Sequence, residues 1–281
     1  MNTHYRIQLG NPAILEFRGP DAVRFLNGQL TQDVRCVVGN GTSRSSCVTD
    51  AKGRLQFRVM LTEFGPDVLW VEGAADWAEA LEARLTRYLI ADDVETADLT
   101  SSYSLVHFTG WEPDAPAGVL VRKSSRFGVE GTDWWVPAGG EIEFPAGVEL
   151  LAGDALEDFR IARGVPAWGA ELVEGMLPPE ARLEATDLSY QKGCYIGQEV
   201  ISRIKSAGKV NRYLSRFRFD EKVPLVLGPL ENSAGAVAGE LTSVSLRAHD
   251  GMRQALGYVK RGAADLFFRA ADGTAYPALI D

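Results

Sequence analysis

Short runs of alternating apolar and polar residues, separated by glycine and proline turns, recur along this sequence and limit the folds that it can adopt. Leu55, Phe57 and Val59 alternate with polar neighbours directly after the turn at 50–53. This alternation is typical of a half-buried strand with a turn before it. We therefore expect an antiparallel meander over residues 45–72.

Two segments have the spacing of amphipathic helices. The first covers residues 76–90 and begins with a capping-box pattern at Asp76 and Glu79. The second covers residues 154–163 and ends at Gly164. Helices and strands are interspersed without the regular alternation of a doubly wound parallel sheet, so the predicted fold class is α+β. The short strand-like runs after residue 212 predict a small all-β module at the C-terminal end.

Composition excludes several classes of protein. The 281 residues are 46% hydrophobic and 24% charged, which is typical of a globular protein. No stretch approaches the roughly 20 apolar residues that span a bilayer. The first residues lack the apolar region of a signal peptide. We therefore expect a cytoplasmic protein without a membrane segment.

Cysteine and histidine are too scattered to predict a disulfide framework or a metal site. Cys36, Cys47 and Cys194 form no C-x-x-C pair, and the three histidines form no cluster with them. The acidic run at Asp92, Asp93 and Glu95 is interpreted as a solvated connection rather than a metal site, because no further ligand motif accompanies it. No metal is predicted.

The segment Lys192–Glu199, with the sequence KGCYIGQE, is the least ordinary stretch of the chain. Two glycines flank Cys194, and glycine lets a backbone approach a ligand closely. A helix that begins near Gly197 and the ammonium of Lys192 would both favour an anion here, including the Cys194 thiolate. The alternative is that Cys194 is a small buried apolar residue and Lys192 a solvated charge.

Basic residues gather directly after this segment, although the whole chain has a net charge of −9. They are Arg203, Lys205, Lys209, Arg212, Arg216 and Arg218. Such a cluster could attract a polyglutamylated or phosphorylated cofactor, or RNA. A solvated face is favoured over an RNA site, because no aromatic residues are interleaved with the charges.

The motif Lys192–Glu199 followed by Arg203 resembles the signature of the YgfZ-type folate-binding proteins, which are relatives of the glycine cleavage T-protein, an aminomethyltransferase. The resemblance extends over nearly the whole chain. Further similar segments are Gly28–Val34, Asp50–Arg54, Arg87–Val94, Gly164–Pro166 and Gly239–Ser243.

The resemblance implies a three-domain cloverleaf around a central hole, with a C-terminal β-barrel-like domain. The implied domains are 1–45 together with 140–200 for folate binding, 46–139 as an inserted α+β domain, and 201–281. It also implies a tetrahydrofolate-type cofactor and a role in assembly or repair of iron–sulfur clusters in client enzymes. A link to tRNA thiomodification is implied as well, with tRNA as a partner.

Site residues follow from the resemblance, position by position. Lys192 and Cys194 are the implied functional pair, and both are assigned as catalytic. The implied cofactor-binding residues are Lys192, Tyr195, Gln198, Glu199, Arg203, Arg160, Trp168 and Asp50. For two of them an alternative stands: Trp168 could belong to the core rather than stack on a pterin, and Asp50 could bond its own turn.

The sequence departs from the T-protein at two places. A paired-aspartate segment of the T-protein corresponds here to Leu55–Arg58, which holds no carboxylate. Relatives often carry a glutamate two residues before the glycine at 164, where this chain has Ala162. The first difference argues against aminomethyl transfer, and the second weakens or rearranges pterin binding.

We therefore expect an accessory protein that binds a reduced folate. In it, the Cys194 thiolate would accept or pass a one-carbon, sulfur or cluster-related group. The competing predictions are a folate-dependent aminomethyl or methyl transferase and an RNA-binding module.

Overall fold

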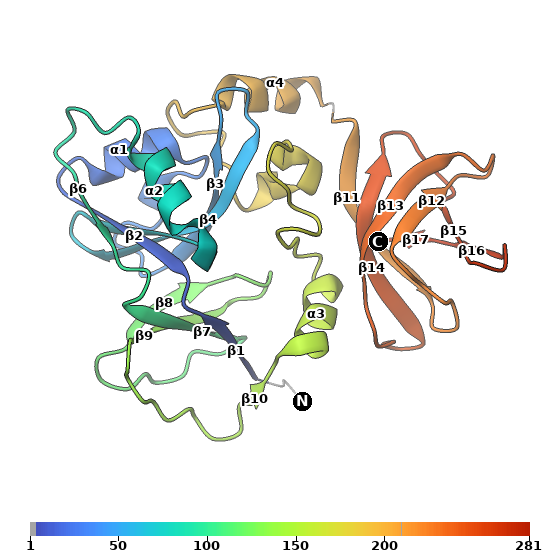
Figure 1. The fold of residues 1–281 in the computed structure, drawn as a ribbon, viewed down its shortest axis with the longest axis horizontal. Coiled ribbons are helices and arrows are strands. Elements are labelled where there is room, and N and C mark those ends of the chain that lie inside the picture. The colour runs from blue at the N-terminus through green and yellow to red at the C-terminus, as the bar shows by residue number, and fades with distance from the viewer. Residues whose placement is uncertain (1–3, 209) are drawn as a thin grey trace. The chain divides into compact units, whose positions relative to one another are not determined.

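The computed structural model describes residues 4–208 and 210–281 of the chain (Figure 1). Lys209, a member of the predicted basic cluster, lies outside the described residues. The chain divides into two compact units, Met1–Leu151 with Glu184–Ser202, and Ala152–Leu183 with Arg203–Asp281. Each unit is described by itself. The three-domain division and the cloverleaf arrangement stay predictions.

One sheet of the first unit is an antiparallel meander with two added strands. Its strands, in spatial order, are β3 (Ser43–Thr49), β4 (Leu55–Gly65), β5 (Val68–Gly73), β2 (Ala13–Arg18) and β6 (Glu95–Asp98). Every neighbouring pair is antiparallel, and the register sets Leu61 opposite Val71, both fully buried. The predicted meander over residues 45–72 is confirmed.

A second five-stranded sheet completes the first unit. Its strands, in spatial order, are β10 (Glu149–Leu150), β1 (Tyr5–Gly10), β7 (Tyr103–Thr109), β9 (Gly131–Pro137) and β8 (Leu120–Ser124). Strands β1 and β10 are parallel, and the other pairs are antiparallel. Trp135 packs with Ile14 and Trp70 of the first sheet, so the two sheets share one apolar core. The adjacent Trp134 packs with Phe108 in a separate core.

The described residues of the two units contain few helices. They are α1 (Ala22–Gln29), α2 (Ala78–Thr86), α3 (Gly153–Ala162) and α4 (Gln198–Ala207), with 3-10 turns at Val34–Cys36, Ala75–Trp77, Pro178–Ala181 and Leu183–Ala185. The predicted helix over 76–90 is shorter than expected, and its capping box at Asp76 and Glu79 is wrong. The chain enters α2 through a 3-10 turn, so Trp77 occupies the cap position and no side chain caps the helix. No helix among the described residues is long and apolar enough to cross a membrane.

The second unit contains a seven-stranded sheet that nearly closes on itself. In spatial order its strands are β16 (Ala275–Pro277), β15 (Phe267–Arg269), β12 (Gly228–Glu231), β13 (Val237–Val244), β14 (Met252–Lys260), β11 (Arg212–Asp220) and β17 (Leu279–Ile280). β16 and β17 lie at opposite ends of this order, yet only Ala278 separates them in the chain. The two edges of the sheet must therefore meet, as the curved strands in Figure 1 indicate. This confirms the α+β class and the β-barrel-like C-terminal part.

Candidate functional site

The predicted loop and the predicted turn at Asp50–Gly53 meet backbone to backbone in the first unit. Gly197 has a φ of +88°, and a Cβ there would stand 2.5 Å from the carbonyl oxygen of Asp50 and 2.8 Å from the Cα of Gly53. The hydroxyl of Thr49 donates to the carbonyl of Ile196 at 2.6 Å. The loop must therefore carry glycine at 197, where a side chain would push the turn away.

The early-helix motif Gly28–Val34 holds the other side of the loop. Ile196 N–H donates to the carbonyl of Gly28 at 3.2 Å, and Ser189 N–H donates to that of Thr31 at 2.9 Å. The hydroxyl of Thr31 donates to the carbonyl of Asp187 at 2.7 Å. Three motifs that lie far apart in the sequence thus form one structure around the loop.

The buried side chain of Lys192 anchors the loop to the backbone of the early-helix motif. Its side chain is buried, and Nζ donates to the carbonyls of Leu30 and Gln32, each at 2.7 Å. Nζ also lies 5.2 Å from the centre of the Tyr195 ring. Loss of hydration lowers the pKa of Lys192 to about 7, although Asp33 opposes the shift. A neutral amine still has the two N–H donors that these carbonyls accept. The alternative of a solvated Lys192 is therefore wrong.

The three cysteines occupy different environments. Cys194 is exposed on the loop, Cys36 is half-buried, and Cys47 is fully buried. Burial raises the pKa of both the Cys36 and the Cys47 thiols, and that of Cys47 strongly. The alternative in which Cys194 is a buried apolar residue is thus wrong. Among the three thiols, Cys194 has the accessibility that reaction with a partner requires.

Two polar side chains in the segment that follows Cys194 have no hydrogen-bond partner within the described part of the chain. The Tyr195 side chain is 7% exposed, and its hydroxyl has no hydrogen-bond partner among the described residues. Burial raises its pKa above the usual range. The half-buried amide of Gln198, at the start of α4, likewise makes no side-chain hydrogen bond in the described part of the chain. Buried polar groups are usually satisfied, so an orphaned hydroxyl marks a place where a ligand or water binds.

Asp50 bonds its own turn. Its Oδ1 accepts from the backbone N–H groups of Lys52 and Arg54, each at 2.8 Å. This is the alternative that the Asp-Ala-Lys-Gly pattern left open. The carboxylate shapes the turn against which Gly197 packs, and its assignment to cofactor binding stays a prediction.

Sequence reasoning overlooked Arg84 as a site residue. From α2, its guanidinium donates to Gln56 Oε1 at 2.6 Å, to Gln29 Oε1 at 3.0 Å and to the carbonyl of Thr49 at 2.7 Å. Arg84 thereby connects the early-helix motif to the strand that follows the turn. Nothing in the local pattern indicated this, since Arg84 resembled any arginine on an outer helix face.

The stretch Leu55–Arg58, which replaces the paired aspartates of the T-protein, is fully engaged in the fold. Gln56 accepts the bond from Arg84, and Arg58 forms a two-point ion pair with the buried carboxylate of Asp187 at 2.7 and 3.2 Å. This pair connects β4 to the segment that leads into the Cys194 loop. At these positions, where the T-protein has aspartates, this chain therefore has side chains that make structural contacts.

Two further predicted residues, Arg160 and Trp168, lie in the second unit, outside the loop. Arg160 is buried, and its five N–H donors meet two oxygens of Glu157, one of Glu171, the carbonyl of Val165 and the hydroxyl of Ser243. No donor is left for a ligand unless one of these bonds is exchanged. Trp168 is 37% exposed. Their assignment to cofactor binding stays a prediction.

Glu171 is the centre of this second cluster. Its carboxylate accepts from Arg160, from the hydroxyls of Thr242 and Ser243 and from Ala167 N–H, at 2.6 to 3.0 Å. Its carbonyl accepts from the Tyr258 hydroxyl at 2.7 Å. The cluster connects α3 to β13 and β14, so it stabilises the packing of that helix on the sheet.

The predicted basic cluster is largely neutralised where it is described. Arg212 Nε lies 2.9 Å from Glu180, and Arg218 Nε lies 2.6 Å from Asp281. Arg216 donates to the carbonyl of Ala162 at 3.0 Å. Glu199, Arg203 and Lys205 are exposed on α4. The strand arginines therefore present less free charge than their number suggests.

Metal ligands do not gather in the part of the chain that the structure describes. No group of three or more His, Cys, Asp or Glu side chains there is arranged to hold a metal ion.

Comparison with solved structures identifies the class of fold. The chain superposes on glycine cleavage system aminomethyltransferase T from Bartonella henselae with a TM-score of 0.79 and 17% identity. The match covers 99% of this chain and 85% of that structure. The fold is thus that of an aminomethyltransferase T.

Sequence comparison shows which proteins with this fold the chain is similar to. The chain is 26% identical over 297 residues to the tRNA-modifying protein YgfZ of Serratia proteamaculans, covering 98% of this chain and 83% of the relative. It is 23% identical over 276 residues to the mitochondrial iron–sulfur cluster assembly factor IBA57 homolog of Cryptococcus neoformans, covering 84% and 70%. No family model matches the chain. In sequence the chain is thus similar to YgfZ and IBA57 proteins, and in fold to aminomethyltransferase T, in agreement with the resemblance that its motifs indicated.

Proposed function

We propose that this protein is a folate-binding accessory factor for assembly or repair of iron–sulfur clusters, and that Cys194 is its reactive group. The observation that carries the proposal is an exposed thiol on a loop held by three motifs. Relatives named as a cluster assembly factor and as a tRNA-modifying protein support it. A cytoplasmic location and particular client enzymes stay predictions.

The geometry suits a thiol that carries a group transiently and then passes it on. A thiolate is the nucleophilic and metal-binding form of cysteine. Iron–sulfur clusters usually require four cysteine ligands, whereas Cys47 is sealed in the core. One accessible thiol therefore favours transient transfer of a one-carbon, sulfur or cluster-related group over stable storage of a cluster. The role of Lys192 is to hold the loop through Leu30 and Gln32, because its amine faces these carbonyls.

The polar groups next to Cys194 fit a folate in their chemistry. The Tyr195 hydroxyl can donate or accept one hydrogen bond, and the Gln198 amide can do both, as the edge of a pterin requires. We propose that these two side chains contact the bound cofactor, which would supply one-carbon chemistry. Isothermal titration with tetrahydrofolate tests this: Tyr195→Phe should bind several times more weakly than the wild type. Equal affinities would remove Tyr195 from the folate site.

A complementation experiment tests the thiol. Cys194→Ala should fail to rescue a strain that lacks this protein, although the variant folds, because the thiol is exposed and contributes little packing. Cys36→Ala, the matched control, should rescue the strain. Full rescue by Cys194→Ala would remove the thiol from the mechanism.

An aminomethyl transferase is the second candidate, and it makes a different prediction. It should convert tetrahydrofolate and an aminomethyl donor into methylenetetrahydrofolate at an enzymatic rate. We expect no turnover, because the stretch Leu55–Arg58 holds no carboxylate and Gln56 is bonded to Arg84.

A tRNA partner has less support. The described arginines of β11 are bonded to Glu180, Asp281 and a backbone carbonyl, so only part of their charge is available to phosphates. A salt-dependent gel shift with tRNA tests this partner, with charge reversal of Arg212 and Arg216 as the decisive variant. We expect that reversal to leave any binding unchanged.

A further inference from the structure

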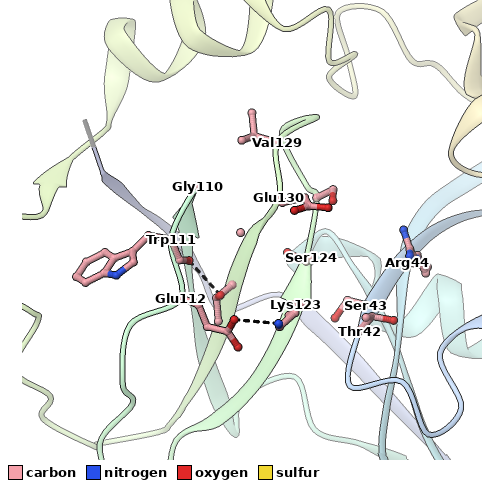
Figure 2. Close-up of a pocket in the computed structure, with 13 residues that line it drawn as sticks. Thr42, Ser43, Arg44, Gly110, Trp111, Glu112, Lys123, Ser124, Val129 and Glu130 are labelled. Atoms are coloured by element: carbon pink, nitrogen blue, oxygen red, sulfur yellow. Dashed lines mark hydrogen bonds and ion pairs between the residues drawn. The ribbon is translucent and has the colours of Figure 1, made fainter. Parts of the chain in front are cut away.

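A pocket of about 520 Å³ opens in the first unit, where its two sheets adjoin. Its walls come from the start of β3, the segment after β7, the end of β8 and the hairpin that leads into β9 (Figure 2). The ring of Trp111 contacts His4 and Phe108, and Figure 2 shows it directed away from the other labelled side chains. The lining therefore combines charged and hydroxyl groups with a comparable share of apolar surface. The volume lies within the range of small-molecule sites.

Two opposite charges in this pocket have no partner among the residues that the structure describes. Within the described residues, neither the Arg44 guanidinium nor the Glu130 carboxylate forms an ion pair or a side-chain hydrogen bond. The Thr42 hydroxyl is buried and also has no partner. Arg44 and Thr42 come from the start of β3, whereas Glu130 comes from the hairpin, so the two charges lie on different walls.

The remaining charges of the pocket satisfy each other. Lys123 Nζ lies 3.0 Å from Glu112 Oε2. This pair offers one donor and one acceptor to a further polar group, and neither charge needs a counterion. An amide matches such a pair, since it carries both a carbonyl and an NH₂ group.

Buried contacts hold the walls in place. Arg126, in the hairpin beside Ser125, donates two bonds to Glu72 at 2.6 and 2.7 Å and one to Asp133 at 2.7 Å. Lys123 N–H donates to the carbonyl of Gly41 at 3.0 Å, which connects β8 to the chain before β3. A ligand would therefore meet a preformed site and would not have to order it.

We propose that this pocket binds a small polar amino acid in its zwitterionic form. The α-carboxylate pairs with Arg44 and the α-ammonium pairs with Glu130, while the Thr42 hydroxyl supplies a further bond. An anion alone would leave Glu130 unpaired beside it, and a cation alone would do the same to Arg44. A side-chain amide, as in glutamine, would face Lys123 and Glu112. This site is independent of the proposed folate function.

Calorimetric titration with L-glutamine tests the proposal, together with two matched ligands that each lack one charge. N-acetyl-L-glutamine has no ammonium, and L-glutaminamide has no carboxylate. We expect L-glutamine to bind in the millimolar range or tighter, and each analogue at least about tenfold more weakly, because one charge-assisted bond is lost. Absence of L-glutamine binding, or equal binding of an analogue, would overturn the zwitterion site.

Two variants test which charge of the ligand each side chain binds. Arg44→Met should weaken binding of L-glutamine about tenfold or more and leave binding of L-glutaminamide unchanged. Glu130→Gln should likewise weaken binding of L-glutamine and leave binding of N-acetyl-L-glutamine unchanged. Both side chains are exposed, so the variants should fold. Arg87→Met and Glu79→Gln, which change exposed residues outside the pocket, are the controls and should bind like the wild type. Unchanged glutamine binding by Arg44→Met or Glu130→Gln would refute the assignment.

Discussion

The region around Lys192 and the region around Arg160 bury a cation in opposite ways. Lys192 meets two neutral carbonyls, and burial lowers its pKa to about 7. Arg160 meets the carboxylates of Glu157 and Glu171, which raise its pKa although burial opposes them. The Lys192 amine can therefore lose its proton near neutral pH, whereas the Arg160 guanidinium, which stays protonated in proteins, is held charged still more firmly by its carboxylate partners.

This difference shows that burial alone does not decide in which direction the pKa of a cation shifts. The resemblance implied that both residues contact the cofactor. The structure gives Arg160 a complete set of protein acceptors, so it stabilises the second unit whether or not it also contacts a cofactor. Lys192 retains a proton equilibrium next to the exposed thiol loop.

The largest expected effect comes from breaking the Arg160 cluster. Glu171→Gln leaves a buried guanidinium with less compensation and turns an amide NH₂ toward other donors. We expect a loss of about 3 kcal/mol or more in the free energy of unfolding. Differential scanning calorimetry measures it, and Glu174→Gln, an exposed neighbour, is the control. Equal unfolding of the two variants would mean that the cluster contributes little.

A smaller effect, but one that depends on pH, is expected at Lys192. The unfolded chain holds this proton up to the ordinary pKa of 10.5, and the folded chain only to about 7. Between these values the unfolded state binds more protons, so this group makes the free energy of unfolding rise with pH, by at most about 1.4 kcal/mol per unit. Below pH 7 both states are protonated and the slope disappears.

Lys192→Met should abolish this slope. Tryptophan fluorescence reports the first unit, because Trp70, Trp77, Trp111, Trp134 and Trp135 all lie there. Urea unfolding from pH 7 to 9 should show the wild type gaining about 2 kcal/mol over the variant. Parallel pH profiles would contradict a lowered pKa at Lys192.

The smallest effect separates the two tyrosines. Tyr258→Phe removes the donor to the carbonyl of Glu171 and should cost about 1 kcal/mol. Tyr195→Phe removes a hydroxyl without a partner and should leave the stability unchanged or raise it by less than about 1 kcal/mol. Urea titration measures both variants. A larger loss at Tyr195 than at Tyr258 would show that its hydroxyl has a structural role.

Sequence predicted the elements that local periodicity encodes. The alternation at Leu55–Val59 predicted a half-buried strand, and the glycine at 197 predicted the start of α4. The capping box at Asp76 failed because a 3-10 turn precedes α2, and a local pattern does not distinguish this entry from an α-helical one.

Local sequence patterns could not predict the long-range contacts. Arg84 reaches Gln29 and Gln56 across the fold, and no spacing rule connects these positions. The partners of Lys192 are backbone carbonyls, which leave no mark on residue type. The motifs located the loop, but the structure was needed to separate its exposed thiol from its buried amine.

The contact between Gly53 and Gly197 has a consequence for engineering. Two bare backbones touch there, so the reactive loop and its neighbouring turn form an interlocking pair. Grafting the eight-residue motif onto another scaffold would misplace the sulfur unless the recipient also offered a side-chain-free surface at that point. The transferable module is therefore the loop together with its turn.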